Sequence, residues 1–101
     1  MPKLYIYFGL RVFFYANEHH PVHVHGFKAG RESKAEIIVI NGKVVEIRFL
    51  DVRGMDPLTG GDLADFQALV ERYAADIVKK WTDFFILHKH ITPVKINRRL
   101  K

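Results

Sequence analysis

The sequence predicts an α+β fold, in which an antiparallel β-meander of about five strands packs against one long C-terminal α-helix. Two observations lead to this prediction. Within the first fifty residues, apolar and polar side chains alternate with a period of two, which is typical of half-buried strands. From about residue 62, apolar residues recur at steps of three and four, which is typical of an amphipathic helix. We expect a single domain over residues 1–101, with strands at about 3–50, a loop at 51–61, the helix at about 62–90 and a basic tail at 91–101.

The first two expected strands lie within residues 3–15, where two runs of alternating aromatic and aliphatic residues are separated by Gly9. Because successive side chains of a strand point to opposite faces, the second run places Arg11, Phe13 and Tyr15 on one face. The tyrosines of the first run are candidates to join that face, namely Tyr5 and Tyr7.

A hairpin is expected around Asn41-Gly42, which is the strongest short hairpin signal in the chain. A strict two-residue turn would pair Ile37 with Glu46 and would mix polar and apolar side chains on each face. A one-residue slip moves every side chain to the other face, so we favour a three-residue loop that pairs Ile37 with Ile47. The other pairs of this register are Val39 with Val45, Ala35 with Phe49, and Glu36 with Arg48.

The helix is expected to begin after a glycine-rich loop, with Thr59 and Asp62 resembling a capping box. It is expected to end before Pro93, because proline disfavours helix in the residue that precedes it. An unbroken helix to His88 would be ~40 Å long, which exceeds the width of a small sheet, so we expect a bend or an overhang. The expected apolar positions are Leu63, Phe66, Val70, Tyr73, Ile77, Trp81 and Phe84.

The charge and composition of the chain restrict the partners, the chemistry and the location that we expect for the protein. The formal net charge is +5, and residues 79–101 contribute seven basic groups against Asp83 alone. Such an end can attract phosphates or an acidic partner, or it can be a solvated tail. There are no cysteines, which excludes disulfides and thiolate chemistry. Neither a signal peptide nor a membrane-spanning apolar run is evident, so we expect a cytoplasmic protein with no membrane partner.

The strongest chemical signal is residues 17–25, which hold four of the six histidines beside a carboxylate. In a strand that begins after Pro21, His23 and His25 project from the same face with their backbones about 6–7 Å apart. Two imidazoles in this arrangement can share a divalent transition metal such as zinc. The remaining metal ligands are expected upstream, from His19 and Glu18, while the position of His20 is left open.

The same residues also suit acid–base catalysis. His23 and His25 can take a proton from a ribose hydroxyl and return one to a leaving oxygen, with Glu18 nearby. Arg11 can stabilise the charge that develops on the phosphate, and the aromatic residues beside it can stack on bases.

A structural interpretation of these features is also open. The histidines can simply fill a polar sheet face, and the aromatic residues can be covered by a partner chain or by a second copy in a homodimer. Other features are more simply structural. They are Trp81, Phe84 and Phe85 as core or interface, His88 and His90 as partners of the helix dipole, and Glu32 and Lys34 as a solvated strand edge.

The stretch Asn17–His25 resembles the signature of a family of small bacterial proteins grouped as domain of unknown function 4160. The likeness extends to Met1-Pro2, Gly30-Arg31-Glu32 and Lys80–Phe85, and Val22 stands where the family commonly has a second proline. The Asn41-Gly42 hairpin and the Leu87-His88-Lys89 ending look like the Bacteroidetes branch. The resemblance implies that His23 and His25 form the signature pair, with Glu18, His19 and Glu32 as supporting positions.

The resemblance implies no established activity. Members often lie beside a second small domain, an arrangement that suggests components of toxin–antitoxin systems. We therefore expect a small bacterial toxin–antitoxin-type protein that acts on RNA, or on a partner protein encoded nearby, through the face of His23 and His25. The alternatives are a metal-binding accessory domain and a non-enzymatic partner-binding module. If the protein is an enzyme, these residues predict a metal- or histidine-dependent reaction of the nuclease or hydrolase kind.

Overall fold

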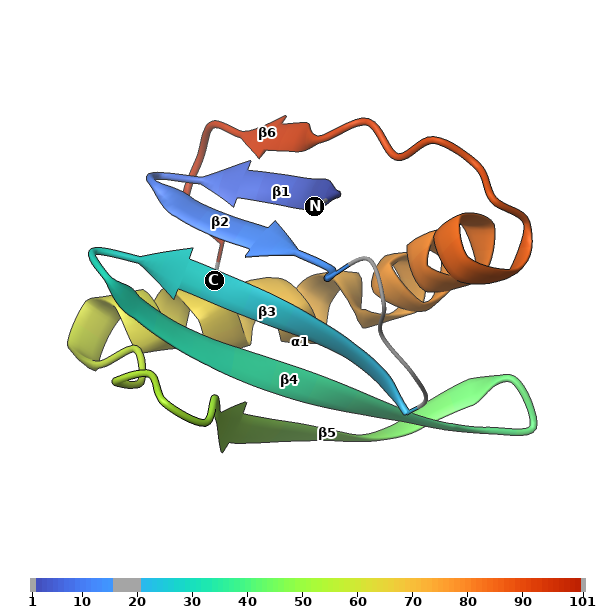
Figure 1. Ribbon diagram of the computed structural model, residues 1–101, viewed down its shortest axis with the longest axis horizontal. Coiled ribbons are helices and arrows are strands. Elements are labelled where there is room, and N and C mark those ends of the chain that lie inside the picture. The colour runs from blue at the N-terminus through green and yellow to red at the C-terminus, as the bar shows by residue number, and fades with distance from the viewer. Residues whose placement is uncertain (1, 16–20, 101) are drawn as a thin grey trace.

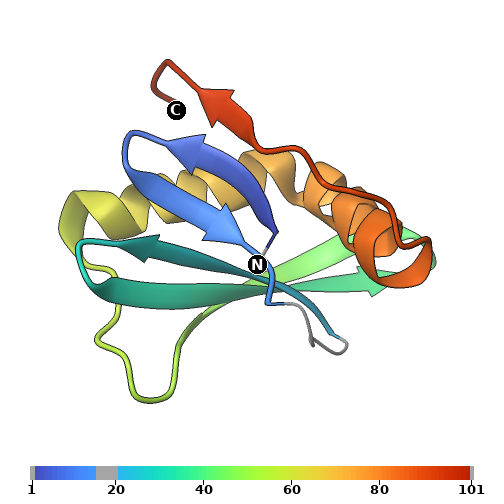
Figure 2. The same ribbon diagram turned by 45° about the horizontal axis from the view of Figure 1, so that its top comes forward.

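The computed structural model describes residues 2–15 and 21–100 and confirms the α+β fold (Figure 1). One sheet has the strand order β5-β4-β3-β2-β1-β6, and strands β1 to β5 form the expected antiparallel meander. Helix α1 lies against one face of this sheet, and none of the described helices lies on the opposite face, which we call the open face (Figures 1 and 2). The elements are β1 (Lys3–Tyr7), β2 (Leu10–Phe13), β3 (Val22–Lys28), β4 (Arg31–Ile40), β5 (Lys43–Asp51), α1 (Gly60–Trp81), the π-helical turn η1 (Thr82–Ile86) and β6 (Val94–Ile96).

The turn between β1 and β2 sets the faces of the aromatic residues. Phe8 and Gly9 both have positive φ angles, of 48° and 84°, and this two-residue turn pairs Tyr7 with Leu10. In the same register Tyr5 pairs with Val12, so both tyrosines lie on the face that α1 covers. The expectation that they join the face of Arg11 is therefore wrong, because Ile6 is the residue that pairs with Arg11.

The hairpin between β4 and β5 combines the two registers that the sequence allows. Asn41 and Gly42 form a two-residue turn with φ angles of 52° and 79°, so Val39 pairs with Val44. The predicted three-residue loop and the pairing of Val39 with Val45 are therefore wrong. A β-bulge after Ile38 then shifts the register by one residue. Beyond the bulge the predicted pairs are confirmed, namely Ile37 with Ile47, Ala35 with Phe49, and Glu36 with Arg48.

Helix α1 begins and ends differently from the prediction. The Thr59 hydroxyl makes no capping hydrogen bond and Asp62 forms an ion pair with Lys28 at 3.1 Å, so the expected capping box is absent. The expected bend is present at Tyr73, whose φ of −108° and ψ of 17° are not helical. The helix then continues through η1 and stops at residue 86, short of the predicted 90. The chain leaves the helix there because His88 adopts a left-handed conformation, with φ of 55°.

Part of the expected basic tail forms an edge strand instead. Strand β6 lies parallel to β1, with Val94 paired with Tyr5 and Ile96 paired with Tyr7 (Figure 2). Arg99 then donates a hydrogen bond of 2.8 Å to Asp65 on α1. The buried Ile96 explains this docking, because a short apolar strand is stabilised by covering the edge of β1.

The core lies between the sheet and α1. Trp81 is buried there against Phe14, with Phe84 and Phe85 partly buried beside them, as expected for core residues. Helix and sheet approach each other closely at Gly26, where a Cβ atom would lie 2.5 Å from the ring of Phe66. The buried apolar residues of the core are Leu4, Tyr5, Tyr7, Leu10, Val12, Phe14, Val22, Val24, Ala35, Ile37, Leu58, Phe66, Leu69, Val70, Ala74, Ile77, Trp81, Ile91 and Ile96.

Candidate functional site

Strand β3 carries both histidines of the sequence signature that the structure describes. Val22 and Val24 are buried towards α1, and the alternation of the strand directs His23 and His25 to the other side. Their ring centroids are 5.4 Å apart. The ring of His23 also lies 5.5 Å from that of Trp81, where the end of α1 meets the start of β3. The two imidazoles are thus neighbours, but their surroundings differ.

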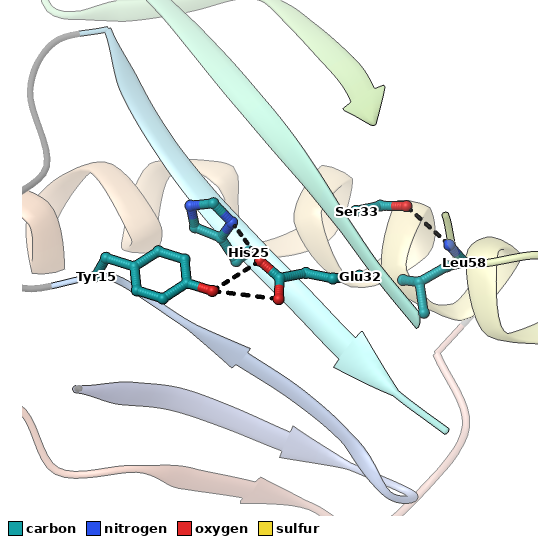
Figure 3. Close-up of polar contacts among 5 residues, drawn as sticks. All are labelled: Tyr15, His25, Glu32, Ser33 and Leu58. Atoms are coloured by element: carbon teal, nitrogen blue, oxygen red, sulfur yellow. Dashed lines mark hydrogen bonds and ion pairs between the residues drawn. The ribbon is translucent and has the colours of Figure 1, made fainter. Parts of the chain in front are cut away.

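His25 belongs to a buried polar network on the open face. Its Nδ1 atom lies 3.1 Å from the Glu32 carboxylate, which also accepts hydrogen bonds of 2.9 and 3.2 Å from the Tyr15 hydroxyl (Figure 3). Since a carboxylate accepts hydrogen bonds, Nδ1 carries the proton, and a neutral His25 has its lone pair on Nε2. His25 is only 5% exposed and Glu32 only 4%, so the contact is little weakened by solvent.

Aromatic rings complete the surroundings of His25. Phe13 stacks on the imidazole at 5.6 Å and Tyr15 meets it edge-on at 4.5 Å. This packing, rather than α1, covers the ring.

Glu32 corrects one prediction from the sequence. It was expected at a solvated strand edge together with Lys34, but β4 is flanked by β3 and β5, so Glu32 is buried and Lys34 is half-buried. The signal that could have revealed this is the turn at Ala29-Gly30, whose positive φ angles of 54° and 78° set a two-residue hairpin. That register pairs Lys34 with His25 and places Glu32 on the same face, one diagonal step away.

The loop before α1 holds the start of β4 in place. The backbone N–H of Glu32 donates to the Asp56 carbonyl at 2.9 Å, and the Ser33 hydroxyl accepts a hydrogen bond of 3.0 Å from the backbone N–H of Leu58 (Figure 3). These contacts fix the backbone from which the Glu32 carboxylate projects.

A hollow of about 210 Å³ lies next to this network on the open face. The exposed Arg11 guanidinium lies 5.1 Å from the centre of the Phe27 ring and forms one side of the hollow. Phe27 was not among the candidate residues, although its place two positions after His25 puts it on the same face. The residues that line the hollow are Arg11, Phe13, Tyr15, Phe27 and Glu32.

The strand register arranges the open face in transverse rows. Arg11 pairs with Phe27, and Phe27 pairs with Glu32, so these three side chains form a row across β2, β3 and β4. The same row continues through Ile6 to Lys95 on β6. The neighbouring row consists of Phe13, His25, Lys34 and Leu50. Aromatic side chains therefore lie at the centre of the open face, with Arg11, Lys34 and Lys95 around them. On the β4–β5 side of the same face, Arg48 pairs with Glu36 and forms an ion pair of 2.9 Å with Glu46.

The metal site predicted from the sequence is tested only in part. Within residues 2–15 and 21–100, no group of three or more histidine and carboxylate side chains is placed to hold a metal ion. The Nδ1 atom of His23 donates to the Pro21 carbonyl at 2.8 Å, and that of His25 faces Glu32. Glu18 and His19 lie outside the described residues, as does His20, so their part in a metal or catalytic site stays a prediction.

The fold and this site define a small α+β protein with an open, aromatic sheet face. The chain belongs to the family described as Domain of unknown function (DUF4160), whose model matches residues 9–82. No curated protein and no solved structure matches the chain. The branch within the family stays a prediction, and so does the cytoplasmic location. No helix in the described part of the chain is long and apolar enough to cross a membrane.

Proposed function

We propose that this protein is a toxin–antitoxin-type component that binds single-stranded RNA on its open face and acts on it there. The observation that carries the proposal is the hollow in which Arg11, Phe27 and Glu32 meet beside the His25 network. Exposed bases stack on aromatic side chains, and each such contact contributes about 1–3 kcal/mol to binding. A sheet face that presents aromatic rings among cations is a recurrent platform for single-stranded RNA.

The charges of the open face support an anionic ligand. Arg11 and Lys95 are exposed on it, and Lys34 is half-buried beside His25. The Glu32 carboxylate is engaged by His25 and Tyr15, so its negative charge is partly offset within the network. Phosphates of a bound strand would therefore meet a cationic rim of Arg11, Lys34 and Lys95 beside an aromatic centre, whereas the carboxylates of Glu36 and Glu46 lie on the β4–β5 side of the same face.

For a cleavage reaction, we assign His25 as the general base. Glu32 holds Nδ1–H, which leaves the basic lone pair on Nε2, as in other histidine bases that a carboxylate orients. We assign His23, whose Nδ1 is held by the Pro21 carbonyl, as the general acid, with Arg11 stabilising the phosphate. Glu18 stays a proposed contributor just before this strand.

The binding proposal is tested by fluorescence anisotropy with a labelled single-stranded RNA. Arg11→Gln should weaken binding about fivefold or more and should lower the slope of log affinity against log salt by about 1. Arg72→Gln is the matched control, because it removes the same charge from an exposed position on α1. Equal effects of the two substitutions would show that only net charge matters and would contradict the proposal.

The proposed activity is tested by expressing the protein alone in a bacterial host. Growth should arrest, RNA should be cleaved, and His25→Ala should relieve both effects while circular dichroism shows a folded protein. If growth arrests without RNA cleavage and the arrest survives His25→Ala, the protein acts through a protein partner instead, and the catalytic assignment is wrong.

A further inference from the structure

We infer that the hollow on the open face recognises a guanine base, so that the RNA bound there is read at guanine. This inference rests on the proposed function, since it names the base that the same site selects.

The row of Arg11, Phe27 and Glu32 provides the geometry. Neighbouring strands lie about 4.8 Å apart, so the backbones of Arg11 and Glu32 are separated by roughly 10 Å with Phe27 between them. A planar group that stacks on the ring of Phe27 therefore has a guanidinium at one edge and a carboxylate at another. Arg11 is exposed, so its side chain can move from above Phe27 towards the edge of the incoming base.

The size of the hollow favours a base over a larger ligand. Its volume of about 210 Å³ is smaller than that of pockets for drug-sized molecules, which run to roughly 300–1,000 Å³. One ring system fits in such a space, while the ribose and phosphate of the same nucleotide remain outside, near the cationic rim.

The hydrogen-bonding groups select among the bases. Arg11 offers only donors and Glu32, as a carboxylate, offers only acceptors. Guanine has acceptors at O6 and N7, which match a guanidinium, and adjacent donors at N1 and N2, which match a carboxylate. Adenine and cytosine each bring a single amino group to a carboxylate, and uracil brings only its N3–H. Guanine is therefore the base that satisfies both side chains with paired hydrogen bonds.

The Glu32 carboxylate has lone pairs left for these donors. Tyr15 and His25 together direct two hydrogens at it, whereas a carboxylate has about four lone-pair positions. The two residues also fix its orientation, so the ligand does not need to order a mobile side chain.

The test compares short oligouridylates that carry one central guanosine, adenosine, cytidine or uridine, with binding followed by fluorescence anisotropy. The guanosine strand should bind about tenfold or more tightly than the others. Two analogues should each lose much of this extra affinity for guanosine. They are inosine, which lacks the N2 amino group, and 7-deazaguanosine, which lacks the N7 acceptor.

Two variants test which side chain contacts which edge of the base, namely Glu32 at the N1 and N2 edge and Arg11 at the O6 and N7 edge. Glu32→Gln should bind the guanosine and inosine strands equally, and Arg11→Gln should bind the guanosine and 7-deazaguanosine strands equally. If Glu32→Gln fails to fold, the base analogues on the wild-type protein still decide the question.

The outcomes separate this inference from the proposed function. Equal affinity for all four strands would overturn guanine recognition and leave RNA binding intact. Absence of binding to every strand would overturn the proposed function itself.

Discussion

Gly26→Ala is the perturbation whose effect follows most directly from the structure. Gly26 lies between His25 and Phe27 in β3, where the ring of Phe66 on α1 packs directly against the backbone of the strand. An added Cβ would lie 2.5 Å from Cδ1 and 2.7 Å from Cε1 of the Phe66 ring. Phe66 is fully buried, so its ring cannot move aside without displacing its neighbours.

The expected change in the free energy of unfolding is the sum of two opposing contributions. Overpacking of a buried methyl group costs about 1–3 kcal/mol, and replacing glycine restricts the unfolded chain, which returns about 0.4–1 kcal/mol. We expect a net loss of about 1.3 kcal/mol in the free energy of unfolding, which corresponds to a melting temperature lower by roughly 5–10 °C in a domain of this size. Urea denaturation followed by circular dichroism measures the loss directly.

A matched control is available in the same chain. Gly61 lies in α1 with open space where its Cβ would be, so Gly61→Ala should be neutral or stabilising by up to about 1 kcal/mol. Combining Gly26→Ala with Phe66→Leu should recover part of the loss, because the smaller side chain gives way. A Gly26→Ala protein as stable as the wild type would refute the packing of α1 against β3.

The remaining predictions concern the polar groups. Tyr15→Phe removes a donor to Glu32 and should cost about 1 kcal/mol in urea denaturation. Burial, together with the hydrogen bond to Asp76, raises the pKa of Tyr5 well above its ordinary value of 10.0. Its contribution to stability is therefore complete below pH 10 and declines as the pH rises further, and Tyr5→Phe should flatten the alkaline part of a plot of stability against pH. Because the proposed binding of RNA uses no metal, added zinc should leave the melting temperature unchanged. A rise that His23→Ala abolishes would instead support the metal-binding alternative.

Much of the fold follows from local patterns. The alternation of Val22, His23, Val24 and His25 is enough to predict which side chains share a face of β3, because the face towards α1 takes the apolar set. The apolar spacing between residues 62 and 81 likewise predicts the buried stripe of α1. In strongly periodic segments of this kind, the type of secondary structure and the buried face can be predicted from the sequence alone.

The features that were missed depend on turns and on long-range pairing. The bulge after Ile38 lets the Asn41-Gly42 turn coexist with the apolar register, an option that a comparison of two uniform registers does not include. Strand β6 has only three residues and pairs with β1, some ninety positions away, so no local pattern indicates it.

In the candidate site, too, some residues could be predicted from local sequence and others depend on how the strands pair. Arg11, His23 and His25 could be chosen by residue type, because few other side chains suit the chemistry. Residue type does not single out Glu32 or Phe27, since a charged residue near a turn and an aromatic residue in a strand usually have structural roles, and only the family resemblance indicated Glu32 as a supporting position. Their significance depends on the Ala29-Gly30 turn, whose register brings both residues to the same face as His25.

The central claim is that the open face binds single-stranded RNA. The most direct measurement is a titration of the ¹⁵N-labelled protein with a short single-stranded RNA, followed by backbone amide chemical shifts. The account predicts that the largest changes lie in β2, β3 and β4, around Arg11, Phe27 and Glu32, while Arg72 on α1 is unaffected. Changes centred on α1, or none at saturating RNA, would contradict it.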